Sequence, residues 1–160
     1  QVDVANRTPL HLAARFGHEA VVNRLLETPG CDVNQASVQG ATPLFMAAFF
    51  AHEMVLKRLL KAPGCDVNKV NNNGHSPLTM AAGSGHEENV STLLESGCDV
   101  NKVDVYGRTA LCIAARSAPA TKKLAIMTII IEAPGCYANE NSQWQWVELV
   151  MELMEMLGHI

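Results

Sequence analysis

The stretch ATPLFMAAFFAHEMVLKRLLKAPGCDVN (41–68) occurs four times along the chain, with substitutions. The other copies are RTPLHLAARFGHEAVVNRLLETPGCDVN (7–34), HSPLTMAAGSGHEENVSTLLESGCDVN (75–101) and the looser RTALCIAARSAPATKKLAIMTIIIEAPGCYAN (108–139). The Thr or Ser near the start of each copy recurs at separations of 34, 34 and 33 residues. A period of this size indicates a repeat architecture, in which each copy packs against the next.

Each copy predicts two consecutive helices. A Thr or Ser such as Thr8 is a good helix N-cap, because its hydroxyl accepts a hydrogen bond from an otherwise unpaired N–H. The proline that follows it in three copies, such as Pro9, suits the first helical position. Two alanines then allow close helix approach. After a break at Gly–His, apolar residues return at helical spacing, as in the segment 21–26.

Glycines recur at two places in the repeat. One near the end of each copy is expected to end the second helix: Gly30, Gly64, Gly97 and Gly135. Another lies two residues before the next cap, where a tight turn favours positive φ. These positions are Gly40, Gly74 and Gly107, with Asn6 as the tolerated substitute.

These motifs resemble the ankyrin repeat, whose pattern runs turn–Gly–x–Thr–Pro–Leu–His–x–Ala–Ala, then Gly–His, a second helix and Gly–Ala–Asp–Val–Asn. The resemblance covers about residues 2–142. It implies an all-α ankyrin-repeat solenoid, in which helix–turn–helix repeats are joined by β-hairpin-like turns. Residues 1–160 then form a single array, with repeats at about 3–36, 37–70, 71–103 and 104–141 and a partial capping repeat at 142–160.

The chain departs from the family pattern locally. Phe45, Thr79 and Cys112 stand where the family has His after Pro–Leu, and Ala51 replaces the glycine of Gly–His. The fourth copy lacks Gly–His and carries four extra residues near 117–123. Both ends look cut, since the first residue is Gln1 and the fifth copy stops early.

The C-terminal segment 147–157 is rich in Met and is expected to form a helix that caps the stack. It would bury Leu149, Leu153 and Met156. Shortening the chain at about residue 143 is then expected to lower its thermal stability.

Composition excludes several kinds of partner. The net charge of −4 argues against nucleic acid, which is bound by clustered Lys and Arg. No apolar run approaches the roughly 18 residues of a membrane span. The strongest, at 124–131, is too short.

Histidines and asparagines follow the period. His18, His52 and His86 each precede a Glu, but no copy adds the second His of a metal-binding helix. We interpret them as structural turn residues and expect no metal site. His11 is expected to bond near Thr8. The asparagines match a family position that some ankyrin proteins hydroxylate, and a turn role with bonds to their own backbone is favoured: Asn34, Asn68 and Asn101.

Cysteines occupy equivalent positions in successive copies. They are expected to stack about 10 Å apart, beyond the reach of a disulfide: Cys31, Cys65, Cys98 and Cys136. Small buried thiols predict an intracellular, cytoplasmic protein. No His accompanies Cys112 in its own or the preceding copy, so catalysis by this thiol is not expected, and neither is a cofactor.

The residues after Ala–Ala are expected to leave the first helix and reach toward a groove beneath the turns. By the resemblance, these positions and the turn tips form a concave recognition surface. The candidate partner-binding residues are Arg7, Arg15, Phe16, Val38, Gln39, Phe49, Phe50, Asn72, Asn73, His75, Ser84, Val105, Tyr106, Arg108 and Arg116.

Two adjacent aromatics, Phe49 and Phe50, stand out in a chain with only 5% aromatic residues. Phe16 and Phe50 are equivalent positions one repeat apart, so they predict a contiguous apolar strip of the kind that marks contact sites. The alternative is that Phe49 or Phe50 packs into the core between repeats.

The function expected from these features is non-enzymatic. The chain would bind a protein partner through its concave face, as a scaffold, inhibitor or adaptor, with no nucleic-acid, membrane or small-molecule ligand. Two alternatives stay open: an engineered ankyrin scaffold that binds or catalyses, and the interaction segment of a larger enzyme or channel.

Overall fold

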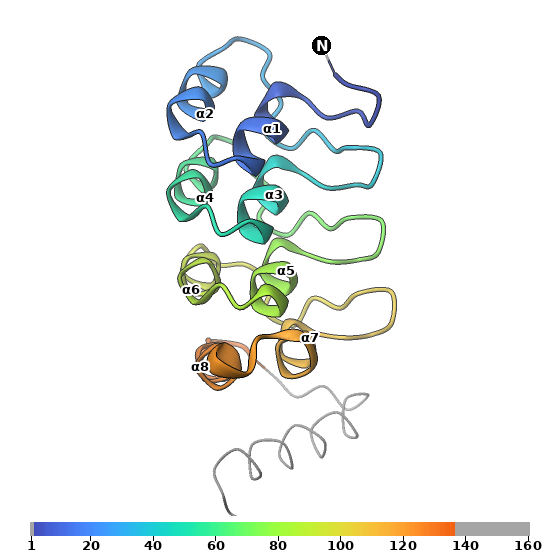
Figure 1. The fold of residues 1–160 in the computed structure, drawn as a ribbon, viewed down its shortest axis with the longest axis vertical. Coiled ribbons are helices and arrows are strands. Elements are labelled where there is room, and N and C mark those ends of the chain that lie inside the picture. Colours follow the sequence, from blue (N-terminus) through green and yellow to red (C-terminus); the bar gives the residue numbers. More distant parts are fainter. Residues whose placement is uncertain (1, 137–160) are drawn as a thin grey trace, which may run out of the picture.

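Eight helices stack in two columns in the computed structural model, which describes residues 2–136. The first helices of the repeats form one column and the second helices form the other, while the turns project from the first column (Figure 1). The first helices are α1 (Pro9–Arg15), α3 (Pro43–Phe49), α5 (Pro77–Ser84) and α7 (Ala110–Ser117). The second helices are α2 (Glu19–Leu26), α4 (Glu53–Leu60), α6 (Glu87–Glu95) and α8 (Ala120–Ile131).

The predicted caps begin every first helix. Thr42 Oγ1 accepts from the N–H of Phe45 at 3.2 Å, and the cap residues of the other first helices do the same in their own repeats. In the first repeat the Thr8 N–H donates to His11 Nδ1 (3.1 Å), so His11 Nε2–H donates to the carbonyl of Ala41 in the next repeat (3.0 Å). Burial lowers the pKa of His11, which keeps this ring neutral and structural.

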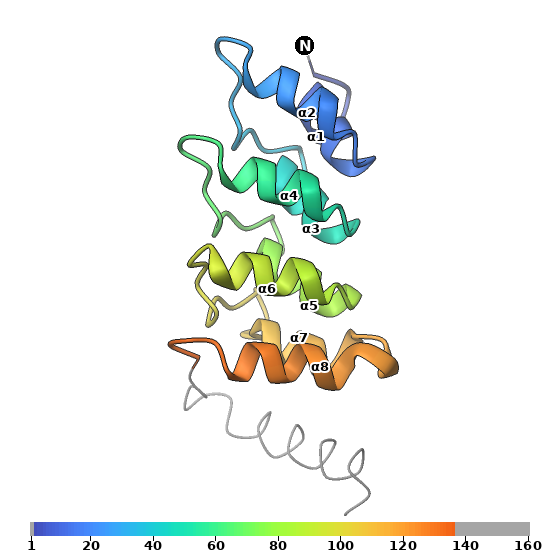
Figure 2. The same cartoon turned by 90° about the vertical axis from the view of Figure 1, so that its left-hand side faces the viewer.

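The core lies between the columns and between neighbouring repeats. Leucines after each cap and the paired alanines are buried, as are the inward residues of the second helices such as Leu59 and Ile130. Small alanine side chains let the first helices approach closely, so one apolar core runs along the array. The helix pairs that enclose it stack one on the next along the long axis (Figure 2).

The turns pair as short hairpins, although residues 2–136 contain no assigned strand. Ser37 N–H donates to the Ala41 carbonyl within one turn (2.9 Å), and Val38 N–H donates to the Ala5 carbonyl of the preceding turn (2.9 Å). The same pattern recurs further along, where Asn72 N–H donates to Gln39. The predicted glycines of these turns have positive φ, as has Asn6.

The predicted end positions were inaccurate for both the first and the second helices of the repeats. The second helices stop before most of the glycines: α2 ends at Leu26, and Gly30 lies in the turn that follows. The first helices extend further than predicted. In α1, α3 and α5 the interrupting residue comes later, at Gly17, Ala51 or Gly85 with positive φ, whereas α7 ends where Ala118 becomes extended before Pro119. Arg15, Phe49, Gly83–Ser84 and Arg116–Ser117 are therefore helical; only Phe16 and Phe50 lie just past a helix.

The extra residues of the fourth copy lengthen its second helix. Helix α8 has 12 residues, against eight or nine in the other second helices, and begins directly after Pro119. The predicted capping segment 147–157 lies outside the described residues.

Candidate functional site

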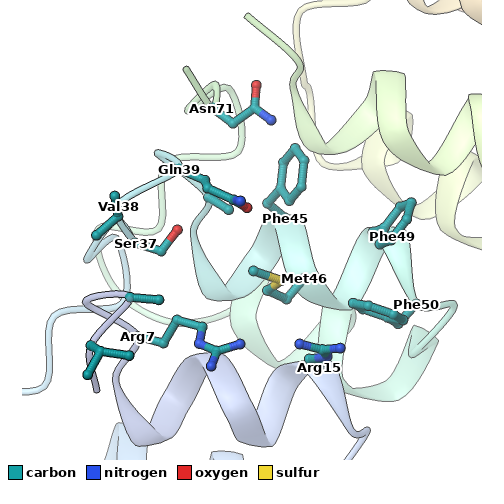
Figure 3. Close-up of a pocket in the computed structure, with 13 residues that line it drawn as sticks. Arg7, Arg15, Ser37, Val38, Gln39, Phe45, Met46, Phe49, Phe50 and Asn71 are labelled. Carbon is teal, nitrogen blue, oxygen red and sulfur yellow. The ribbon is translucent and has the colours of Figure 1, made fainter. Parts of the chain in front are cut away.

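An open groove of about 500 Å³ lies between the turns and the first helices of the first two repeats (Figure 3). Its size falls within the range of ligand-binding clefts. The residues that line it are Val4, Ala5, Arg7, Arg15, Ser37, Val38, Gln39, Ala41, Phe45, Met46, Phe49, Phe50 and Asn71.

Helix α3 provides the apolar side of the groove. The cap at Thr42 starts the helix so that Phe45, Met46 and Phe49 fall on its groove side. Phe49 and Phe50 are 38% and 36% exposed, so neither packs into the core between repeats. Their rings meet edge to face with centroids 4.8 Å apart, which holds both at the surface.

Arg15, the last residue of α1, lies beside these rings. Its guanidinium carbon is 5.2 Å from the Phe50 ring centroid and 5.6 Å from that of Phe16. The predicted apolar strip of Phe16 and Phe50 therefore also includes the cationic guanidinium of Arg15, which lies near both rings. Among residues 2–136, no carboxylate forms an ion pair with Arg15.

The turns form the opposite side. Val38, at a turn tip, is 64% exposed. Arg7 is held by Asp3, whose Oδ2 accepts from Arg7 Nε and Nη2 at 2.7 Å each, and these bonds lower the pKa of Asp3. The buried hydroxyl of Ser37 has no hydrogen-bond partner in the described part of the chain.

The structure gathers only part of the predicted set at this groove. Six predicted residues line it: Arg7, Arg15, Val38, Gln39, Phe49 and Phe50. The others do not: Phe16, Asn72, Asn73, His75, Ser84, Val105, Tyr106, Arg108 and Arg116. The Phe16 ring lies next to Arg15, which lines the groove. The rest belong to the turns and first helices of the third and fourth repeats.

Several of these other residues hold turns together. Asp104, with a fully buried side chain, accepts from Arg108 Nε (2.7 Å) and Nη2 (2.6 Å) and lies 3.4 Å from His75 Nε2. Burial raises the pKa of Asp104, but its bonds from Arg108 and Tyr106 outweigh this and hold the pKa below its usual value. Arg108 also lies over the Tyr106 ring, at 4.8 Å.

Asn72 links two turns. Its Nδ2 donates to the Val38 carbonyl at 3.0 Å, alongside the backbone bond between the same turns. This side chain therefore fixes the position of the groove's turn side.

Three further lining residues, Val4, Ala5 and Ala41, belong to the turn tips that were expected at this surface. Sequence reasoning missed the other four, which are Ser37, Phe45, Met46 and Asn71. A signal existed for Phe45, which stands where the family pattern has a structural His. Because Phe45 has no imidazole to bond the neighbouring turn, it packs instead along the groove and is only 7% exposed.

Two of the three turn histidines that were predicted to be structural make hydrogen bonds between repeats. His52 Nε2–H donates to the Arg15 carbonyl (2.8 Å), and His86 Nε2–H donates to the Phe49 carbonyl (3.0 Å). Each caps the first helix of the preceding repeat at its C-terminal end. Within residues 2–136, no cluster of three His, Cys, Asp or Glu could hold a metal ion.

The hydrogen-bond partners predicted for the asparagines were wrong, because their side chains bond the next repeat and not their own turn. Asn34 Nδ2 donates to the Gly64 carbonyl (2.6 Å) and its Oδ1 accepts from Asp66 N–H (2.8 Å), both in the next repeat. Asn68 and Asn101 likewise bond the following repeat. The preceding aspartates make the local turn bonds instead, so the asparagines connect repeats.

None of the five cysteines, all of which lie within residues 2–136, forms a disulfide. Cys112 is buried, with Sγ 3.2 Å from Thr109 Oγ1, while the four periodic thiols are only partly buried. Burial raises the pKa of Cys65 to about 11 and of Cys98 to about 12, which leaves these thiols protonated and weakly reactive at neutral pH.

Comparison with protein families agrees with the stacked helix pairs. A family model of ankyrin repeats (3 copies) matches residues 1–71 and 44–142, together most of the chain. The protein belongs to the ankyrin repeat family. Ankyrin repeats are generally protein–protein interaction modules and are typically non-catalytic. A comparison with curated proteins finds no match. None of the ankyrin helices described in residues 2–136 is both long and apolar enough to cross a membrane.

Proposed function

We propose that this ankyrin array is a non-enzymatic module that binds a protein partner through the concave face formed by its turn tips and first helices. The observation that carries the proposal is the groove of the first two repeats, in which Phe49 and Phe50 remain exposed beside Arg15. Aromatic residues and Arg are the types that dominate binding energy in protein interfaces.

The support is energetic as well as compositional. A partner that covers these rings removes apolar surface from water without a large ordering cost, because the two rings already hold each other edge to face. The turn side is equally ordered, since Asn72 and the backbone bonds fix neighbouring turns. Preorganised surfaces of this kind favour tight association.

A reducing, intracellular setting fits the same proposal. None of the five cysteines in residues 2–136 forms a disulfide, and the raised pKa values of the partly buried Cys65 and Cys98 give these thiols little nucleophilic character.

We predict that Phe50→Ala weakens partner binding by about 1–3 kcal/mol while leaving the fold intact, because the side chain is at the surface. The measurement is affinity capture from lysate on the wild type and the variant, with quantification of each captured protein, and a thermal melt of both. Met54→Ala is the matched control, since Met54 is an exposed apolar residue on the second-helix column. Partners lost equally from both variants, or unfolding of Phe50→Ala, would contradict the proposal.

A further inference from the structure

Charge is distributed unevenly between the two columns of helices. The chain has a net charge of −4, yet the turns (2–8, 36–42, 70–76 and 103–109) and the first helices carry four Arg and only two Asp. Both aspartates are neutralised within their own turns by Arg7 and Arg108. Every described glutamate lies on a second helix or directly after one. The concave side is therefore basic in an acidic protein.

Arg15 is the part of this excess charge that lies in the groove. Its guanidinium lies near the rings of Phe16 and Phe50 and has no ion pair within the described residues. An Arg that stacks on aromatic rings keeps its N–H edges available, and those edges match the two oxygens of a carboxylate. The group that complements this position is an anion.

The surface next to Arg15 is apolar. Phe45, Met46, Phe49 and Phe50 line one side of the groove, no acidic residue is among its lining residues, and Asp3 of the first turn is already bound to Arg7. Figure 3 shows Phe45, Met46, Phe49 and Phe50 along α3 with Arg15 beside Phe50. An apolar side chain of a partner that enters here would meet aromatic and thioether surface, with Arg15 next to it.

We propose that this groove binds an acidic peptide segment of the protein partner, with an Asp or Glu carboxylate on Arg15 and an adjacent large apolar side chain against Phe45, Met46 and Phe49. The inference rests on the proposed function and defines its partner. A basic segment is disfavoured, because Arg15 repels a cation and no free carboxylate lines the groove. Single-stranded nucleic acid is disfavoured by the net negative charge of the chain.

The test is selection of a random dodecapeptide phage library on the immobilised full chain. The variants are Arg15→Glu and Phe50→Ala, with Arg24→Glu as the control because Arg24 is highly exposed on α2, in the other column. Circular dichroism and thermal melting establish that each variant is folded. Selected peptides are then synthesised with a fluorophore, and their dissociation constants are measured by anisotropy.

The expected result is enrichment, on the wild type and on Arg24→Glu, of peptides that combine Asp or Glu with a neighbouring Phe, Trp, Leu or Met. Arg15→Glu weakens their binding by about tenfold to a hundredfold, as loss of a charge-assisted hydrogen bond predicts. Selection on Arg15→Glu instead enriches Lys or Arg beside the apolar residue.

Other outcomes separate the two proposals. Apolar peptides without acidic preference that bind the wild type and are lost on Phe50→Ala overturn this inference and leave the proposed function standing. Peptides that bind Phe50→Ala as well as the wild type overturn both. Failure to enrich any peptide on the wild type, or binding of a labelled oligothymidylate that depends on Arg15, overturns the inference.

Discussion

At the scale of single residues, one departure from the repeat pattern has a direct consequence for the backbone. Ala51 stands where the pattern has Gly and adopts φ = 62°, whereas Gly17 and Gly85 at equivalent positions have φ of 71° and 85°. A left-handed conformation places the Cβ of an L-residue too close to backbone oxygen, and glycine avoids this cost. The methyl side chain of Ala51 therefore introduces strain into the connection between α3 and α4.

Ala51→Gly is predicted to raise the free energy of unfolding by about 1 kcal/mol, which is the left-handed cost less the extra chain entropy of glycine. Chemical denaturation followed by circular dichroism measures the change. The control is Ala125→Gly, at an exposed position inside α8, which should lower stability by about 1 kcal/mol. A destabilised Ala51→Gly would show that the conformation carries no strain.

At the scale of elements, the turns differ in how they are held although they share one pattern. In the first turn Asp3 and Arg7 form an ion pair at the surface, with both side chains 30% exposed. In the fourth turn the equivalent Asp104 is fully buried beneath Arg108 and His75. Removing a buried acceptor leaves its donors without a hydrogen-bond partner, whereas water can take the place of a lost partner in an exposed ion pair.

Asp104→Ala is accordingly predicted to destabilise the array by about 1–3 kcal/mol. Asp3→Ala should have a smaller effect.

The pKa of Asp104 is lowered in the folded state, so its carboxylate stabilises the fold at pH values above the usual pKa of 3.8. This stability is lost as the pH falls through the folded pKa. Unfolding measured from pH 7 down to acid should show a shallower acid loss in Asp104→Asn than in the wild type. Equal slopes would contradict this role.

At the scale of the whole molecule, each repeat depends on its neighbours. Leu25 and Leu59 are equivalent positions in successive second helices, but Leu59 is fully buried between two repeats while Leu25 is only partly buried in the first. Stability in such arrays is the sum of repeat and interface contributions, so interior positions contribute to two interfaces.

Leu59→Ala is predicted to cost about 2–5 kcal/mol, as other fully buried leucines do, and Leu25→Ala clearly less. Urea denaturation of both variants, followed by circular dichroism, gives the comparison. Equal losses would mean that burial between repeats does not set the stability of this array.

Much of the fold could be read from local features. The cap hydroxyls, the prolines after them and the positive-φ glycines act within a few residues, so their consequences follow from neighbouring sequence alone. Helix ends were less accurate, because α1, α3 and α5 continue until just before a residue with positive φ, and α7 continues to Ser117. Of the candidate site, the exposed pair Phe49–Phe50 and the turn residues Val38 and Gln39 were predicted at the groove.

The sequence by itself determined the repeat, its paired helices and the family, because period, caps and turns are local and recur four times. Only the tertiary structure decided which side chains form one site. Arg15 meets Phe50 across 35 positions of sequence, and Phe45 faces the turns of two repeats only after stacking. The buried position of Asp104 depends on the same packing. Such contacts are set by how one repeat lies on the next, which no single repeat's sequence specifies.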